Sequence, residues 1–173
     1  MSSFLDPPEA PGPLDENTEL YDFLQGAVFF EGGDDHEEID EPFSVWQACD
    51  EIINGGIGQL LVNGSGDGAE KAVSGLRRFG LPELAELLDE VFDALGPRPV
   101  PNDPGERLDW LGAKFGPLKG GGGAMRQMAP FLAPYNGRYY DLKAAIDAEH
   151  DGEGYLWRIC RYIESRRAIF FPS

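Results

Sequence analysis

The residues with the clearest potential for chemistry are carboxylates, and they are concentrated at the start of the chain. Residues 1–70 contain 17 Asp and Glu and no Lys or Arg, whereas residues 71–173 contain 14 residues of each sign. The whole net charge of −17 therefore comes from the first 70 residues. Net charge governs association and solubility rather than fold. We therefore expect a partner that is itself basic, or one that normally holds a polyanion.

The candidate partner-binding carboxylates form four groups along the sequence. The densest is the run over residues 34–41. The most regular group recurs at three- and four-residue steps over residues 83–93, which on a helix gives spacings of about 4.5 to 6 Å. Duplex DNA carries about one charge per 1.7 Å of axis over both strands, so such a row could imitate part of one strand, although the solvated face of an ordinary amphipathic helix has the same pattern. The predicted acidic surface consists of Asp15, Glu16, Glu19, Asp22, Asp34, Asp35, Glu37, Glu38, Asp40, Glu41, Asp50, Glu51, Glu83, Glu86, Glu90 and Asp93.

Metal binding and catalysis lack the residue patterns that they need. His36 and His150 are the only histidines, and no second His or Cys is near His36. A calcium loop over residues 63–74 would have suitable residues in its first half, but Ser74 stands where the loop requires Glu. The glycine-rich stretches do not follow a predicted strand, and residues 120–123 lack the Gly-Lys-Ser/Thr ending of a phosphate loop. We therefore predict a protein that is not an enzyme and has no cofactor or metal.

Charge and hydropathy also exclude several partners and locations. Direct nucleic-acid binding needs Lys and Arg, and an anionic membrane surface would repel this chain. No apolar run approaches the roughly 18 residues of a membrane span, and the N-terminus has no basic region or apolar signal core. Cys49 and Cys160 are predicted to be buried as small hydrophobic residues. The sequence predicts a cytoplasmic protein.

The elements that position the carboxylates are predicted to be helices. The clearest one begins at Pro82, with Leu84, Leu88 and Val91 on one side and the carboxylates on the other. No segment shows four or more apolar–polar alternations, so strands are not predicted. We predict an all-α fold with a Pro-rich acidic arm at residues 1–15 and a single compact domain at residues 16–173. The domain is expected to contain about nine short helices, which begin near residues 17, 42, 57, 67, 82, 106, 124, 136 and 153.

One stretch of the chain resembles a known family. Residues 54–66 read Asn-Gly-Gly-Ile-Gly-Gln-Leu-Leu-Val-Asn-Gly-Ser-Gly, and with the apolar positions up to Phe79-Gly80 they are similar to small bacterial helical proteins classed as a domain of unknown function. The best-understood member type is a DNA mimic, which presents carboxylates in a phosphate-like array and occupies the DNA-binding face of a transcription regulator. The resemblance covers roughly residues 44–165. The motif itself is predicted to be structural, since glycine permits turns and Asn satisfies local backbone groups; its residues are Asn54, Gly55, Gly56, Gln59, Asn63, Ser65 and Gly66.

Three functions remain open at this level. The main hypothesis is a DNA mimic that binds a basic DNA-binding protein such as a transcription regulator. The alternative is an immunity protein that neutralises a basic toxin or nuclease by the same charge complementarity. In a third interpretation the acidity only keeps the domain soluble. The C-terminal part of the chain has a short basic group, which consists of Arg158, Arg161, Arg166 and Arg167. This group is too small to indicate nucleic-acid binding. One expectation is that it pairs with the acidic half of the chain.

Overall fold

The computed structural model describes residues 37–118, 120–149 and 154–166, with side chains from Glu41 onward. These residues form seven α-helices and one short 3-10 helix, and no strand occurs among them, which confirms the all-α prediction for this part of the chain. The arm at residues 1–15 and the helix expected from residue 17 lie outside the described residues. The elements are α2 (Glu37–Gly55), α3 (Ile57–Val62), η1 (Gly64–Gly68), α4 (Ala69–Arg78), α5 (Pro82–Leu95), α6 (Pro104–Phe115), α7 (Gly120–Asp147) and α8 (Gly154–Ser165).

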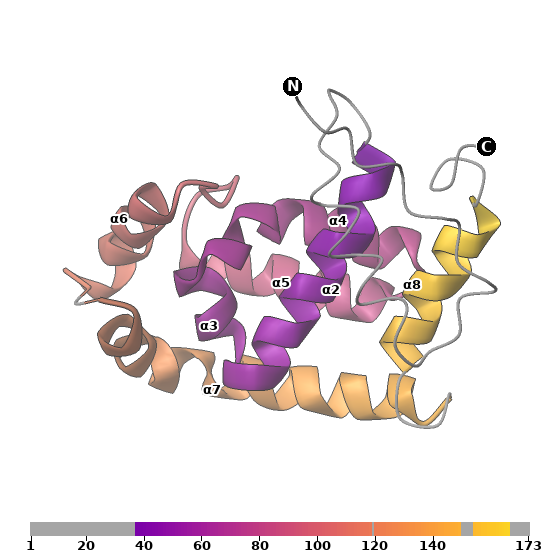
Figure 1. Cartoon of the computed structure of the whole chain (residues 1–173). Helices are drawn as coiled ribbons and strands as arrows, with labels where there is room; N and C mark the ends of the chain where they lie inside the picture. The colour runs from indigo at the N-terminus through magenta and orange to yellow at the C-terminus, as the bar shows by residue number, and fades with distance from the viewer. Residues whose placement is uncertain (1–36, 119, 150–153, 167–173) are drawn as a thin grey trace, which may run out of the picture.

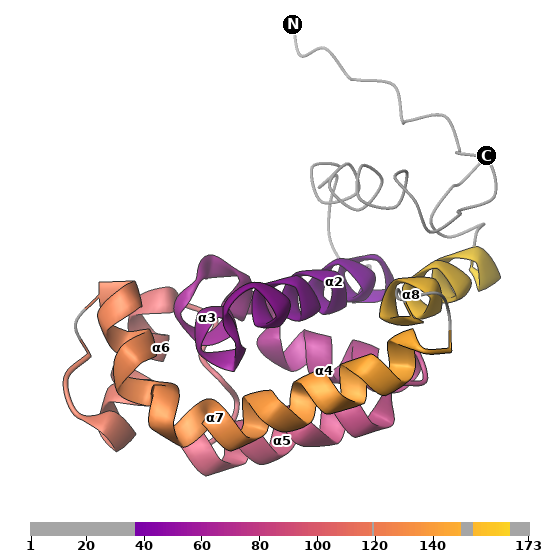
Figure 2. The same cartoon turned by 90° about the horizontal axis from the view of Figure 1, so that it is seen from below.

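The helices pack around α2, α4 and α5, which form the centre of the body (Figure 1). The long helix α7 runs the length of the body and packs on α3, α5 and α8. The view turned by 90° shows α7 passing from the end where α6 lies to the end where α8 lies (Figure 2). The two ends of the body are therefore held together by one helix.

Helix α5 shows how local sequence produces this arrangement. Pro82 occupies the start of the helix. Backbone N–H groups at this position have no acceptor within the helix, so a proline, which lacks an N–H, costs no hydrogen bond there. Leu84, Leu88 and Val91 recur at helical spacing, and all three are buried. Each such side chain contributes about 1.5–3 kcal/mol on burial. Burial of one face against α4 and α7 turns the opposite, acidic face outward.

The contact between α2 and α4 depends on a glycine. A Cβ atom on Gly75 would lie 2.6 Å from Cγ2 of Val45, closer than packed carbon atoms can approach. Val45, Ile52 and Leu76 are fully or almost fully buried along this contact. Gly75 therefore allows α2 to lie against α4 more closely than a larger residue would.

Two helix boundaries differ from the sequence-based expectation. α2 begins at Glu37 rather than at Pro42, so that Pro42 lies inside its first turns; the proline removes one backbone hydrogen bond there without ending the helix. The two helices expected from residues 124 and 136 are one helix, α7, which contains Pro130 and Pro134. Packing of α7 along its length against α3, α5 and α8 offsets the low helix propensity of this proline-containing segment. The expected number of about nine helices was therefore too high for the described residues.

Candidate interaction surface

The outward face of α5 carries a row of four carboxylates. Glu83 and Glu86 are exposed, and the side chain of Asp93 is 68% exposed. Glu90 accepts a hydrogen bond from Arg138 of α7 at 2.7 Å, and both side chains are about half exposed. The buried leucines on the other side of α5 fix the direction of this row. The structure thus brings together the four carboxylates that the sequence placed on this helix.

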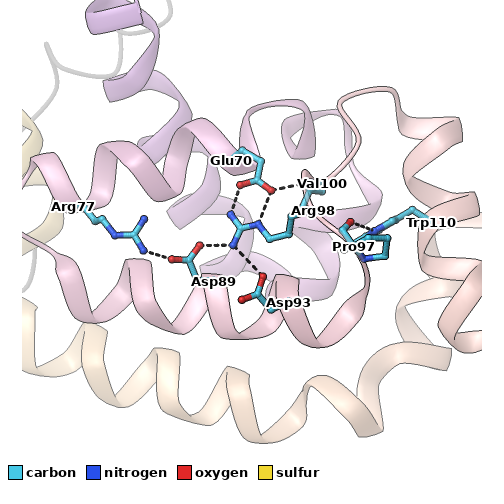
Figure 3. Close-up of polar contacts among 8 residues, drawn as sticks. All are labelled: Glu70, Arg77, Asp89, Asp93, Pro97, Arg98, Val100 and Trp110. Carbon is cyan, nitrogen blue, oxygen red and sulfur yellow. Dashed lines mark hydrogen bonds and ion pairs between the residues drawn. The ribbon is translucent and has the colours of Figure 1, made fainter.

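Arginines bound the row on its α4 side (Figure 3). Asp89 turns away from the row and binds both Arg77 and Arg98. Arg98 also donates to Glu70, with 2.9 Å between Nε and Oε1, and lies 3.6 Å from Asp93. Of these carboxylates, Asp89 and Glu70 form ion pairs within the fold and are mostly shielded from solvent, whereas Asp93 is largely exposed.

The electrostatics of this cluster favour the ionised form of Glu70 and of Asp89. Partial burial alone would raise the pKa of Glu70, but the hydrogen bonds from Arg98 and from the Val100 amide outweigh it and lower the pKa. The same balance of burial against hydrogen bonds from Arg98 and Arg77 lowers the pKa of Asp89. Both groups therefore contribute fixed negative charge that the arginines largely neutralise.

The side chains of most of the other carboxylates of the predicted surface lie outside the described part of the structure. The side chains of residues 37–40 and everything before Glu37 lie outside the described residues, although Glu37, Glu38 and Asp40 are in the first turns of α2. These carboxylates of the predicted surface are Asp15, Glu16, Glu19, Asp22, Asp34, Asp35, Glu37, Glu38 and Asp40.

The remaining three candidates, all on α2, make contacts within the fold. Glu41 is 4% exposed and forms an ion pair with Arg78 of α4 at 3.0 Å. Asp50 accepts a hydrogen bond from Asn54 at 3.0 Å; burial and the adjacent Glu51 nevertheless raise its pKa. Glu41 thus connects α2 to α4, whereas Asp50 makes its contact within α2, and neither forms part of the α5 row.

Glu51, on α2, binds residues in the second half of the motif over residues 54–66. Its two carboxylate oxygens accept hydrogen bonds from Gln59 at 2.6 Å, from Asn63 at 2.9 Å and from the Ser65 hydroxyl at 2.8 Å. These three donors belong to α3 and to the turn that follows it. One carboxylate thus fixes the geometry of the turn, a role that the charge pattern did not indicate.

The first half of the motif forms the turn between α2 and α3. Gly55 is the last residue of α2, and Gly56 has φ +78°, a conformation that favours glycine. A Cβ atom on Gly56 would lie 2.8 Å from the side-chain nitrogen of Asn136. That side chain accepts a hydrogen bond from the Ile57 amide at 2.9 Å and so caps the start of α3 from α7.

A buried arginine that the sequence analysis missed organises the end of the motif. Arg107 of α6 is completely buried. Gly66 leaves room for it, since a Cβ atom there would lie 2.7 Å from the guanidinium carbon. The only local signal is its position four residues before the buried Leu111, on the apolar face of the helix. The guanidinium donates to the carbonyl oxygens of Leu61, Asn63, Pro101 and Asn102 at 2.7–2.8 Å and to the carboxylate of Asp67 at 3.1 Å.

The described residues offer little for other kinds of chemistry. They contain no group of three or more His, Cys, Asp or Glu side chains that could hold a metal ion. His36 and His150 lie outside them. No helix in this part of the chain is long and apolar enough to cross a membrane. An exposed acidic row on a rigid helix is therefore the arrangement with the clearest potential for recognition.

Comparison with known proteins gives a family and no individual relative. The family model described as "DMP19-like protein" matches residues 33–159, from the segment before α2 into the first half of α8. Curated proteins gave no significant match, and neither did solved structures. The matched range is 127 of the 173 residues, and the family is one of non-catalytic DNA mimics. This chain belongs to the family of DMP19-like proteins.

Proposed function

We propose that this protein is a DNA mimic that occupies the DNA-binding face of a basic protein, such as a transcription regulator. The observation that carries the proposal is membership in a family of non-catalytic DNA mimics. The exposed row on α5 supports it, because mimicry needs carboxylates at fixed positions on a rigid element. In this proposal the protein performs no chemistry and acts by competing with duplex DNA.

The carboxylates of the row are about 5 Å apart along the helix axis, a wider spacing than that of the phosphates of one DNA strand. From Glu83 to Asp93 the helix advances ten residues, or about 15 Å. Four carboxylates over that length compare with one phosphate per about 3.4 Å along a single strand. Arg138 neutralises part of the charge of Glu90, so the row presents somewhat less charge than DNA.

The rest of the negative charge lies mainly in the first 40 residues. Residues 1–40 contain 12 Asp and Glu and no Lys or Arg, while residues 41–173 contain 19 acidic and 14 basic residues, a net charge of −5. A strongly acidic segment in the same chain would speed encounter with a basic partner through long-range attraction. Exposed charges separated by more than about 10 Å are screened at 0.1 M salt, so this contribution should decrease as salt is raised.

The test is competition between the partner and DNA. Immobilised protein is used to capture proteins from a bacterial lysate, and the bound fraction is then eluted with duplex DNA or with buffer of the same ionic strength. We expect a basic DNA-binding protein to be released by DNA but not by buffer alone. A bound partner that remains in place at saturating DNA would refute mimicry. If the captured protein is instead a nuclease that the complex inhibits, the toxin-neutralising hypothesis is favoured.

Charge-neutralising variants test whether the α5 row is the surface involved. Glu83→Gln combined with Glu86→Gln removes two exposed carboxylates of the row. Because exposed ion pairs contribute about 0.2–1 kcal/mol each, binding should weaken by about 2- to 30-fold. The matched control is Glu106→Gln combined with Asp109→Asn, which removes the same charge from exposed positions of α6. Equal weakening by both pairs would mean that net charge, rather than the row, determines binding.

A further inference from the structure

Arginines gather at the end of the body where α8 meets the last turn of α4. The ring of Phe79, just after α4, lies 4.4 Å from that of Tyr162 on α8. Arg158 approaches the same turn, since its Nη1 atom would lie 3.3 Å from a Cβ atom on Gly80. Arg166 lies over the Tyr162 ring at 4.6 Å. We call this group the basic patch; it consists of Arg77, Arg78, Arg158, Arg161 and Arg166.

Carboxylates of the body pair with at least three arginines of the basic patch. Arg77, Arg78 and Arg158 each form an ion pair, with Asp89, Glu41 and Glu149 respectively. Arg161 is exposed and lies 5.5 Å from the centre of the Trp157 ring, and it has no ion pair among the described residues. Arg161 is therefore a positive charge without an ion pair in the described part of a protein whose net charge is −17.

The patch lies where the chain enters the body. The ion pair between Glu41, near the start of α2, and Arg78 joins this entry point to the end of α4. α2 also packs on α8, and the beginning of α2 and the end of α8 lie on the same side of the body (Figure 1). The 36 residues before α2 are thus attached directly beside the arginines.

Parts of both oppositely charged pieces lie outside the range that the family model matches. The family match ends at residue 159 and begins at residue 33. It omits Arg161, Arg166 and Arg167 on one side and residues 1–32 on the other, and Arg167 itself lies outside the described residues. Within residues 1–36 there are nine Asp and Glu and no Lys or Arg.

We propose that the acidic segment, residues 1–36, docks on the basic patch of its own chain. Each contact between exposed charges is weak, about 0.2–1 kcal/mol. Attachment through α2 makes binding intramolecular, with an effective concentration on the order of millimolar for a short flexible connection. Several weak contacts can then hold the segment. A consequence that rests on the proposed function is that a basic partner must displace the arginines before it can use these carboxylates.

Carbodiimide cross-linking of the full-length protein tests the docking without any partner. The variant Arg161→Lys places a primary amine in the patch. Carbodiimide joins this amine to a neighbouring carboxylate as an amide, and the water that is lost converts the carbodiimide to a urea. The matched control is Arg126→Lys, at an exposed position of α7 far from α8. Residues 1–71 lack internal trypsin sites, so chymotrypsin is used to locate the cross-links by mass spectrometry. Circular dichroism checks that both variants keep the helical fold.

The expected result is a set of cross-links from position 161 to carboxylates of residues 1–36 within the monomer, at least tenfold more abundant than those from position 126. They should decrease several-fold at 1 M salt, where the screening length is about 3 Å. Equal yields at the two positions, no cross-link from position 161 to residues 1–36, or cross-links found only in a dimer would each overturn the proposal. Failure of the DNA-competition test would leave these yields unchanged, so the two proposals can fail separately.

Discussion

Replacement of Arg107 by alanine should destabilise the protein more than any change on its surface. The side chain is completely buried and crosses from α6 to the turn after α3 and to the loop before α6. Four backbone carbonyl oxygens and the carboxylate of Asp67 accept its hydrogen bonds. The variant would leave all four carbonyls without this donor and would open a cavity beside Gly66.

The magnitude follows from these contacts. A buried acceptor left without its donor costs about 1–3 kcal/mol, which would give an upper sum near 12 kcal/mol for four carbonyls. The carboxylate of Asp67 is 55% exposed, so water can enter from that side and satisfy part of the group. We therefore expect a loss of about 3–5 kcal/mol, as for removal of one partner from a buried ion pair. This is a large part of a typical total stability of about 5–15 kcal/mol.

Urea unfolding followed by circular dichroism measures this effect. With a slope of about 2 kcal/mol per molar urea, the midpoint should decrease by about 1.5–2.5 M. Arg126→Ala is the matched control, since Arg126 is exposed and the change should stay within about 0.5 kcal/mol. Arg107→Lys provides a second measurement if the alanine variant does not fold. Lysine has three donors rather than five, so roughly half of the loss is expected.

The result that would refute the argument is a similar midpoint for Arg107→Ala and Arg126→Ala. In that case the carbonyls would have found water or other donors at no cost, and the close approach at Gly66 would have no energetic role. A normal midpoint for Arg107→Lys together with a low midpoint for Arg107→Ala would instead assign the stabilisation to charge and volume rather than to the planar set of donors.

Two further predictions concern titratable groups. The pKa of Glu70 is lowered below its ordinary value of 4.5 because hydrogen bonds from Arg98 and Val100 outweigh burial, so its contribution to stability is present above that pH and is lost as the pH falls through the folded-state pKa. Glu70→Gln should therefore be destabilised in urea at pH 7, with a deficit that shrinks toward pH 3; a deficit that is constant with pH would contradict this. Burial raises the pKa of Cys49 to about 11, and Cys160 is also buried, so Ellman's reagent at pH 8 should label the native protein far more slowly than the urea-unfolded protein. Rapid labelling without denaturant would show that one of the buried contacts opens.

Local pattern in the sequence was sufficient for α5 and α3. The starts predicted at Pro82 and at residue 57 agree with the structure. Apolar spacing, an initial proline and a terminal glycine are all short-range features, and they also fix which side of α5 is acidic. The predicted resemblance to a family of DNA mimics is confirmed by the match of the family model over residues 33–159.

Packing decided the features that local pattern predicted wrongly or not at all. α7 continues through Pro130 and Pro134 because three other helices support it. Arg138 comes from α7 to bind Glu90 of α5, 48 residues away in the sequence, and so reduces the charge of the predicted row. No pattern within a single helix indicates such a contact.

The chain's amino-acid order alone fixed its helical periodicity and the separation of acidic from mixed-charge residues, since both depend only on neighbours along the chain. The folded arrangement decided which charges remain available. Glu51 and Arg107 appear in the sequence as ordinary charged residues, yet one joins three side chains of the motif and the other joins four carbonyl groups. Their hydrogen-bond partners are set only when folding brings segments distant in sequence within hydrogen-bonding distance. The physical reason is that a charged group is buried only where the fold supplies enough hydrogen-bond partners to replace its water.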